Sequence, residues 1–368
     1  FSFRPLYQTS TLLKMQYWNR EESPPQKYTS NAPIVKHAKI ISLSDVNDDA
    51  NAAVNQHGEL PQGASLLAIG GSIDDFDIED LKQREPNVVF VAHPKARQPL
   101  ADLLTALPSI EWVHARSAGI DFITSPTLSS THATVTNAKG TFSSTLAEYT
   151  LMACSYFAKN IPRLTLQKQD KNWSNYSVLE LRGATLGIIG YGDIGRACAK
   201  LANAYGMNVV ALRRRAPPTT TEDELCRAVY ESSRDNLYKL MGESDYILCS
   251  APLTPETRGM LDAEAFAHAK RDSVFINVGR GPIVNENALI DALLNGRLKG
   301  AALDVFETEP LPTSSELWNL PNVLLSPHNM DQTDTFMHEA TEFFVTENLP
   351  RFVRGETLLN PVDPAAGY

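Results

Sequence analysis

From Ile34 onward, short apolar runs alternate with longer segments in which apolar residues recur at helical spacing. This alternation is typical of parallel strands covered by helices on both faces of a sheet. The runs fall into two blocks, separated by one long helical segment. Strands are predicted at 66–69, 88–91 and 112–115 in the first block, and at 185–189, 208–212, 246–249, 274–278, 300–305 and 323–325 in the second.

Two segments have less regular patterns. The segment between the blocks predicts one long helix, with a capping box at Thr145 and Glu148, that runs toward Lys171 and bends at Pro162. Residues 215–236 are long and polar for a connection between two strands. Their apolar positions suggest a short extra helix.

The 368-residue chain carries a formal net charge of −10, with 43% apolar and 21% charged residues. This composition is that of a globular protein long enough for two domains. An acidic chain is a poor match for nucleic acid, and no apolar run approaches the ~20 residues that cross a bilayer. We therefore expect neither nucleic acid nor a membrane as a partner, and an anionic ligand would need individual arginines.

The four cysteines, at positions 154, 198, 226 and 249, show neither CxxC spacing nor pairing with histidines, so no metal site is predicted. We expect reduced core thiols and a cytoplasmic location. Residues 1–33 are predicted to be an extension. Residues 1–20 contain Arg4, Lys14 and Arg20 but no acid, which could mark the remnant of a transit peptide and a location in an organelle matrix. A disordered or edge-packing extension is the alternative.

A glycine-rich turn, GYGDIG, follows the predicted strand 185–189 and opens a helix. In this context Gly190 permits a tight turn, Gly192 lets the backbone approach a pyrophosphate, and Gly195 allows close packing of helix on strand. Asp193 and Ile194 begin the helix, whose N-terminal N–H groups suit phosphates. The turn therefore predicts a dinucleotide site.

The end of the next strand bears on which dinucleotide is bound. Sites for NAD normally place an acid there, whereas this chain has Arg213, Arg214 and Arg215 in the sequence LRRRAPP. Arginine can bind a 2′-phosphate through two parallel hydrogen bonds, so NADP(H) is the preferred cofactor. A solvated basic turn is the alternative, and NAD(H) stays possible.

Three segments end later strands of the second block: NVGRG (Asn277 to Gly281), DVFETEP (Asp304 to Pro310) and SPHN (Ser326 to Asn329). Because the carboxyl ends of parallel strands share one edge, an arginine, a glutamate and a histidine are expected to converge there. In the first block, the turn SAGID (Ser117 to Asp121) also ends a strand. Arg280, Glu309 and His328 are therefore the candidate catalytic residues.

Together with the segment PLTPET (Pro252 to Thr257), these motifs resemble the D-isomer-specific 2-hydroxyacid dehydrogenase family from about Ile40 to the end. The resemblance implies that Arg280 binds the carboxylate of a 2-keto acid, that His328 protonates the forming alkoxide, and that Glu309 holds the imidazole charged. It also implies that the first block binds the substrate carboxylate through backbone N–H groups in the turn that contains Ser117, Ala118 and Gly119. Four further residues of the second block would line the cofactor site: Pro252, Thr257, Val278 and Asp304.

The resulting prediction is an α/β protein of two domains, each a parallel sheet flanked by helices. Residues 34–137 and 331–368 form the substrate domain, and a Rossmann-type cofactor domain, 138–330, is inserted into it. By resemblance, the chain is an NAD(P)-dependent reductase of small 2-keto acids, such as glyoxylate or hydroxypyruvate, and a homodimer. Formate or phosphite oxidation, or a nucleotide-sensing co-repressor that binds partners, are the alternatives. The sequence after His328, Asn329 to Gln332, departs from the small, glycine-containing family pattern.

Overall fold

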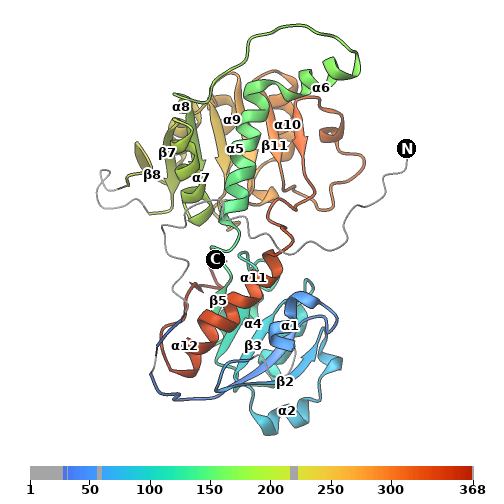
Figure 1. Cartoon of the computed structure of the whole chain (residues 1–368), viewed down its shortest axis with the longest axis vertical. Helices are drawn as coiled ribbons and strands as arrows, with labels where there is room; N and C mark the ends of the chain where they lie inside the picture. Colours follow the sequence, from blue (N-terminus) through green and yellow to red (C-terminus); the bar gives the residue numbers. More distant parts are fainter. Residues whose placement is uncertain (1–27, 31, 56–59, 216–222, 367–368) are drawn as a thin grey trace.

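A computed structural model describes residues 28–30, 32–55, 60–215 and 223–366, so the expectation for residues 1–20 lies outside the described residues. The chain folds into two lobes, each built on its own sheet (Figure 1). One sheet has six strands and the other has seven. The α/β class predicted from the sequence is confirmed.

The six-stranded sheet has the order β13-β5-β4-β3-β1-β2. Five strands are parallel, and the short β13 pairs antiparallel with β5, which corrects the expectation of a purely parallel sheet. Helices α2, α3 and α4 contribute to the core on one face, and α1 and α12 to the core on the other. The elements are β1 (Ala38–Leu43), α1 (Ala52–Asn55), β2 (Ala64–Gly70), α2 (Ile78–Arg84), β3 (Val88–Val91), α3 (Arg97–Ala106), β4 (Trp112–Ala115), α4 (Pro126–Ser130), β5 (Thr134–Asn137), α11 (Phe336–Phe343), α12 (Leu349–Val353) and β13 (Pro361–Val362).

The seven-stranded sheet is parallel throughout, in the order β12-β11-β10-β9-β6-β7-β8. The chain leaves β6 in opposite directions in its two halves, the doubly wound arrangement of nucleotide-binding sheets. The elements are α5 (Ser143–Lys159), α6 (Ile161–Gln169), β6 (Thr185–Ile189), α7 (Asp193–Ala204), β7 (Asn208–Arg213), β8 (Ala228–Glu231), α8 (Arg234–Glu243), β9 (Tyr246–Cys249), α9 (Ala263–His268), β10 (Ser273–Asn277), α10 (Glu286–Leu294), β11 (Leu298–Leu303) and β12 (Val323–Leu325).

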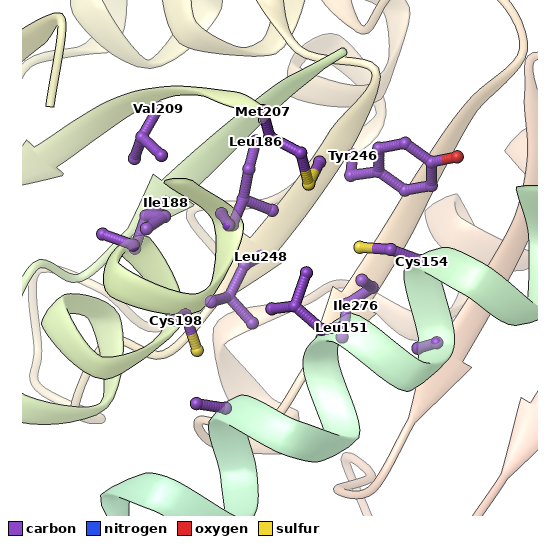
Figure 2. Close-up of a cluster of buried hydrophobic side chains, with 14 of the residues drawn as sticks. Leu151, Cys154, Leu186, Ile188, Cys198, Met207, Val209, Tyr246, Leu248 and Ile276 are labelled. Carbon is purple, nitrogen blue, oxygen red and sulfur yellow. The ribbon is translucent and has the colours of Figure 1, made fainter. Parts of the chain in front are cut away.

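Helices α5 and α7 cover one face of this sheet. Figure 2 shows Leu151 and Cys154 of α5 and Cys198 of α7 in one buried cluster with strand residues such as Leu248 and Ile276. Helices α8, α9 and α10 cover the opposite face. All four cysteines are free and buried, as expected from their spacing.

Three predictions about local structure were wrong. The long helix is two helices, because Asn160 takes a left-handed conformation (φ 52°) and caps α6, whose first turn accommodates Pro162. The first of them, α5, has no side-chain cap, so the capping box at Thr145 and Glu148 does not form. Between residues 223 and 236 the sequence predicts a short extra helix, but the structure has the edge strand β8 there, followed by the start of α8.

Candidate active site

The glycine-rich turn connects β6 to α7 at the carboxyl edge of the seven-stranded sheet. Gly190 has a φ of 97°, and a Cβ there would overlap the backbone of Ala251, so only glycine fits. A Cβ at Gly195 would lie 2.7 Å from the carbonyl oxygen of Gly190, which shows how closely the helix approaches the turn. Gly192 caps α7 and has open space in front of it. The turn therefore fits a dinucleotide phosphate at the N-terminus of α7.

The neighbouring strand ends surround this turn. Ser250, just after β9, donates its hydroxyl to the carbonyl of Gly190 at 2.8 Å. The Thr257 hydroxyl donates to the carbonyl of Pro252 at 2.8 Å, which closes the segment 252–257 into a compact turn. Val278 is buried, and its N–H donates to Cys249. These residues thus lie on the same sheet edge as the glycine turn.

The three arginines lie at the exposed end of β7. Arg213 is the last residue of that strand, and Arg214 and Arg215 follow in a bend with exposed side chains. Arg214 also acts electrostatically on Glu256 of the segment 252–257, where it helps to lower the pKa of that carboxyl, after the hydrogen bonds from Thr254 and the backbone. A positive surface therefore lies one strand away from the glycine turn.

Arg280, Glu309 and His328 are brought together by three adjacent strands. Arg280 follows β10, Glu309 lies in the segment after β11, and His328 follows β12. The Nδ1 atom of His328 is 2.7 Å from Oε2 of Glu309. An ionised carboxylate can only accept, so Nδ1 carries the donated proton, and Nε2 faces away from the carboxylate, available for proton transfer.

The charges of this pair support each other. The hydrogen bond to Glu309 raises the pKa of His328 above its ordinary value and outweighs the opposing effect of burial. Burial alone would raise the pKa of Glu309, but His328, the N–H of Phe306 and the charge of Arg280 together lower it. The Phe306 N–H donates to Oε1 of Glu309 at 2.9 Å, so both carboxylate oxygens are held. The arrangement therefore favours an imidazolium beside a carboxylate.

Asp304 holds the turn that carries His328. Its side chain is buried and accepts hydrogen bonds from the Ser326 hydroxyl (2.8 Å) and the N–H groups of Asn329 (3.1 Å) and Met330 (3.4 Å). His328 itself has a φ of 50°, a left-handed conformation that is uncommon for a residue other than glycine. Asp304, predicted to face the cofactor, thus also fixes the backbone of the candidate proton donor.

The turn 117–121 of the six-stranded sheet closes the site from the other side. A Cβ at Gly119 would overlap the Nη2 atom of Arg280, so the guanidinium lies directly against this backbone. Within the turn, the Ser117 hydroxyl donates to the Gly119 carbonyl at 2.7 Å, and Asn137 donates to the Ala118 carbonyl at 2.5 Å. The residues predicted from the two blocks therefore meet at one place.

Sequence reasoning missed two acids of this site. Asp121 forms an ion pair with Arg280 across the two sheets, and only its place in the SAGID motif pointed toward the site. Asp331 has one carboxylate oxygen, Oδ1, that is buried without a hydrogen-bond partner, and burial raises its pKa. Asp331 falls in the stretch 329–332 that departs from the family pattern, which was the only signal available.

Comparisons with known proteins agree with this geometry. Residues 151–329 match the family model for the D-isomer specific 2-hydroxyacid dehydrogenase NAD binding domain. The chain is 32% identical over 274 residues to a glyoxylate reductase of Thermococcus litoralis, covering 71% of this chain and 80% of that protein. It is 30% identical over 327 residues to a D-3-phosphoglycerate dehydrogenase of Methanocaldococcus jannaschii, covering 88% of this chain but only 59% of that longer protein.

A solved structure also resembles most of this chain. A D-isomer specific 2-hydroxyacid dehydrogenase from Xanthobacter autotrophicus Py2, in complex with NADPH and MES, superposes with a TM-score of 0.73 at 29% identity. The match covers 90% of this chain and all of that chain. No helix in the described ranges is both long and apolar enough to cross a membrane.

Proposed function

Because this chain belongs to the D-isomer specific 2-hydroxyacid dehydrogenase family, we propose that it transfers a hydride between NADP(H) and a small 2-keto acid/D-2-hydroxy acid pair, chiefly as a reductase. The observation that carries the proposal is the 2.7 Å contact between His328 and Glu309 on the same edge as Arg280. This edge combines a proton donor with a group that binds carboxylates. Glyoxylate is the preferred candidate substrate by analogy with the Thermococcus litoralis relative, and hydroxypyruvate by analogy with a glyoxylate/hydroxypyruvate reductase B of Cronobacter sakazakii.

In the proposed reaction, Arg280 binds the substrate carboxylate and polarises the ketone, helped by the N–H groups of Ala118 and Gly119. A reduced nicotinamide cofactor, held at the glycine turn 190–195, would supply the hydride for the ketone carbon. Nε2 of His328 gives its proton to the ketone oxygen, which yields the hydroxyl group, and Glu309 stabilises the imidazolium before this transfer. Asp304 keeps His328 in place through the 326–330 turn.

NADP(H) is the proposed cofactor because Arg213, Arg214 and Arg215 occupy the position where an NAD site has an acid. The related Xanthobacter autotrophicus enzyme binds NADPH. We expect kcat/KM with NADPH to exceed that with NADH by at least about tenfold, because hydrogen bonds to charged groups contribute about 1.5–3 kcal/mol each. Arg213→Asp should shift the preference toward NADH, whereas Arg271→Asp, an exposed change at the opposite sheet edge, should not.

Residues 34–137 with 331–368 and residues 138–330 are proposed to move as two domains. The chain passes between the two sheets twice, near residues 138 and 330, and these crossings would act as a hinge. Closure around the substrate would exclude water from the hydride step.

We further propose a homodimer that forms through α6 and the segment after it, which project from the upper lobe (Figure 1). Helix α6 has no buried residue, and Trp173 is 98% exposed. Leu164, Leu166, Val178 and Leu179 are also exposed around it. Light scattering during gel filtration should give twice the chain mass, and Trp173→Ser with Leu166→Ser should reduce it.

The reaction is tested with a panel of 2-keto acids, followed by the loss of NADPH or NADH absorbance. Glyoxylate or hydroxypyruvate should support turnover, and chiral analysis of the product of hydroxypyruvate reduction should give the D isomer. Turnover of formate or phosphite without any activity on 2-keto acids would overturn the proposal. So would tight NADPH binding with no turnover of any of these substrates.

A further inference from the structure

Arg280 is held by an acid from the opposite sheet. The Nε and Nη2 atoms of Arg280 both donate to Oδ1 of Asp121, at 3.1 and 3.0 Å. Asp121 belongs to the turn after β4, and Arg280 to the turn after β10. The pair is therefore a direct link between the six-stranded and seven-stranded sheets.

The hydrogen bonds of the guanidinium determine which of its edges stays available. Arginine has five N–H donors. Asp121 takes one from Nε and one from Nη2, and the carbonyl of Gly279 takes one from Nη1 at 2.9 Å. One N–H on Nη1 and one on Nη2 are left, and these two nitrogens form the tip of the side chain. This is the edge that can bind a carboxylate through two parallel bonds.

The turn around Asp121 is itself held. Arg97 donates to the backbone carbonyl of Asp121 at 2.6 Å, and Gly119 leaves room for the guanidinium. The side chain of Asp121 is 49% exposed and that of Arg280 29%. An ion pair this exposed contributes little to folding stability. Its consequence is the orientation of Arg280 rather than the strength of the fold.

We propose that Asp121 is a positioning residue that orients Arg280 from the opposite sheet, so that the Nη1–Nη2 edge points at the substrate carboxylate only when the two sheets are together. The inference rests on the proposed function. Asp121 acts here through Arg280 and touches neither the substrate nor the cofactor. It also places a negative charge beside the anion-binding group, which opposes overly tight binding of the substrate in the ground state.

The test compares two substitutions of Asp121 with a matched control. Asp121→Ala removes the acceptor and the charge, whereas Asp121→Asn keeps an acceptor oxygen and removes the charge. Asp80→Ala removes another exposed Asp–Arg pair, with Arg84, whose N···O distance is also 3.0 Å. Asp80 lies on α2, outside the site.

For Asp121→Ala we expect kcat for glyoxylate reduction to fall about 10- to 100-fold, because a displaced catalytic group loses the reactive geometry. KM for glyoxylate should stay within about threefold of wild type or decrease, since a competing negative charge has been removed. Asp121→Asn should restore part of kcat. Calorimetry with oxalate on the NADPH-bound protein should show that affinity for a dicarboxylate is kept or increased in Asp121→Asn.

Several results would overturn the inference. The first is a kcat for Asp121→Ala within about twofold of wild type. The second is a higher KM with an unchanged kcat in that variant, and the third is a fall in its kcat no larger than that in Asp80→Ala. An Asp121→Asn variant no better than Asp121→Ala, or one that binds oxalate more weakly than wild type, would also contradict it. Failure of the wild-type protein to reduce any 2-keto acid would instead overturn the proposed function, and that measurement precedes the variants.

Discussion

The seven-stranded sheet holds its three candidate catalytic side chains partly exposed along one edge, whereas the six-stranded sheet encloses a histidine and an arginine within its interior. On the first, Arg280, Glu309 and His328 lie at strand ends and remain open to a ligand. On the second, His114 is fully buried on β4, and Arg116 just after β4 is bound to Asp48 and Asn51. The same residue types are therefore open to a ligand in one region and enclosed within the fold in the other.

Two histidines show what this difference means. His328 gains a carboxylate partner, and its pKa is raised, so it can hold a proton near neutral pH. His114 lies among Phe90, Trp112 and Phe344, and burial lowers its pKa to about 3. The surroundings, and not the residue type, thus determine whether a histidine can donate a proton.

The largest expected effect comes from removing the proposed proton donor. His328→Ala should lower kcat for keto-acid reduction by about 10²- to 10⁴-fold, the usual contribution of general acid catalysis. Titration of NADPH fluorescence should show cofactor binding unchanged, because the glycine turn lies on other strands. The matched variant His114→Phe should keep kcat at pH 7.5. Equal losses of kcat in the two variants would show that His328 has no special role in proton transfer.

A smaller effect is expected where the two sheets touch. Gly119→Ala places a methyl group where Nη2 of Arg280 lies, and the flexible arginine must move. The fold should survive, but kcat/KM for glyoxylate should fall about 10- to 100-fold because the guanidinium is displaced. Gly242→Ala is the control, since its nearest neighbour would be an ordinary 3.5 Å away. A Gly119→Ala variant with wild-type kinetics would show that Arg280 binds substrate in another position.

The third effect is a shift in pH dependence. Glu309→Gln weakens the hydrogen bond and removes the charge, which together raise the pKa of His328. The proposed reduction needs protonated His328, so the fall of kcat/KM for reduction with rising pH should move to lower pH in the variant. The kcat/KM for oxidation, which needs the neutral histidine, should increase at acid pH. The measurement is kcat/KM against pH in both directions. Glu307→Gln, an exposed change in the same segment, should leave both profiles in place, and a stationary profile in Glu309→Gln would exclude the proposed role.

Local signals explain which parts of the molecule could be predicted from the sequence. The glycine turn and the strand before it were recognisable because their spacing lies within a dozen residues. The pairing of Arg280 with Asp121 spans 159 residues and depends on how two sheets meet, which no local period encodes. The edge strand β8 has only four residues, too few to separate a strand period from a helical one. The helix break at Asn160 was placed two residues late because proline fits the first turn of α6.

The smallest expected effect is that of the buried His114 on the pH dependence of stability, rather than on turnover. His114 is neutral in the fold until about pH 3, whereas in the unfolded chain it binds a proton below about pH 6.5. Between these values the unfolded state holds more protons, so the free energy of unfolding should fall as pH falls, by at most roughly 1.4 kcal/mol per pH unit. His328, whose pKa is raised, affects stability in the opposite sense and above this pH window, since its stabilising contribution is complete below about pH 6.5.

His114→Phe keeps an aromatic ring in place and removes the titrating group, although it loses the hydrogen bond between Nδ1 and Thr136. At pH 7 the free energy of unfolding of His114→Phe should differ from that of the wild-type protein by about 1 kcal/mol. Urea unfolding between pH 4.5 and 6.5 should give a clearly shallower pH dependence for His114→Phe than for wild type or for the exposed control His132→Gln. Identical slopes of the free energy of unfolding against pH in all three proteins would show that the fold does not lower the pKa of His114. The two histidines would then not differ in the way their surroundings predict.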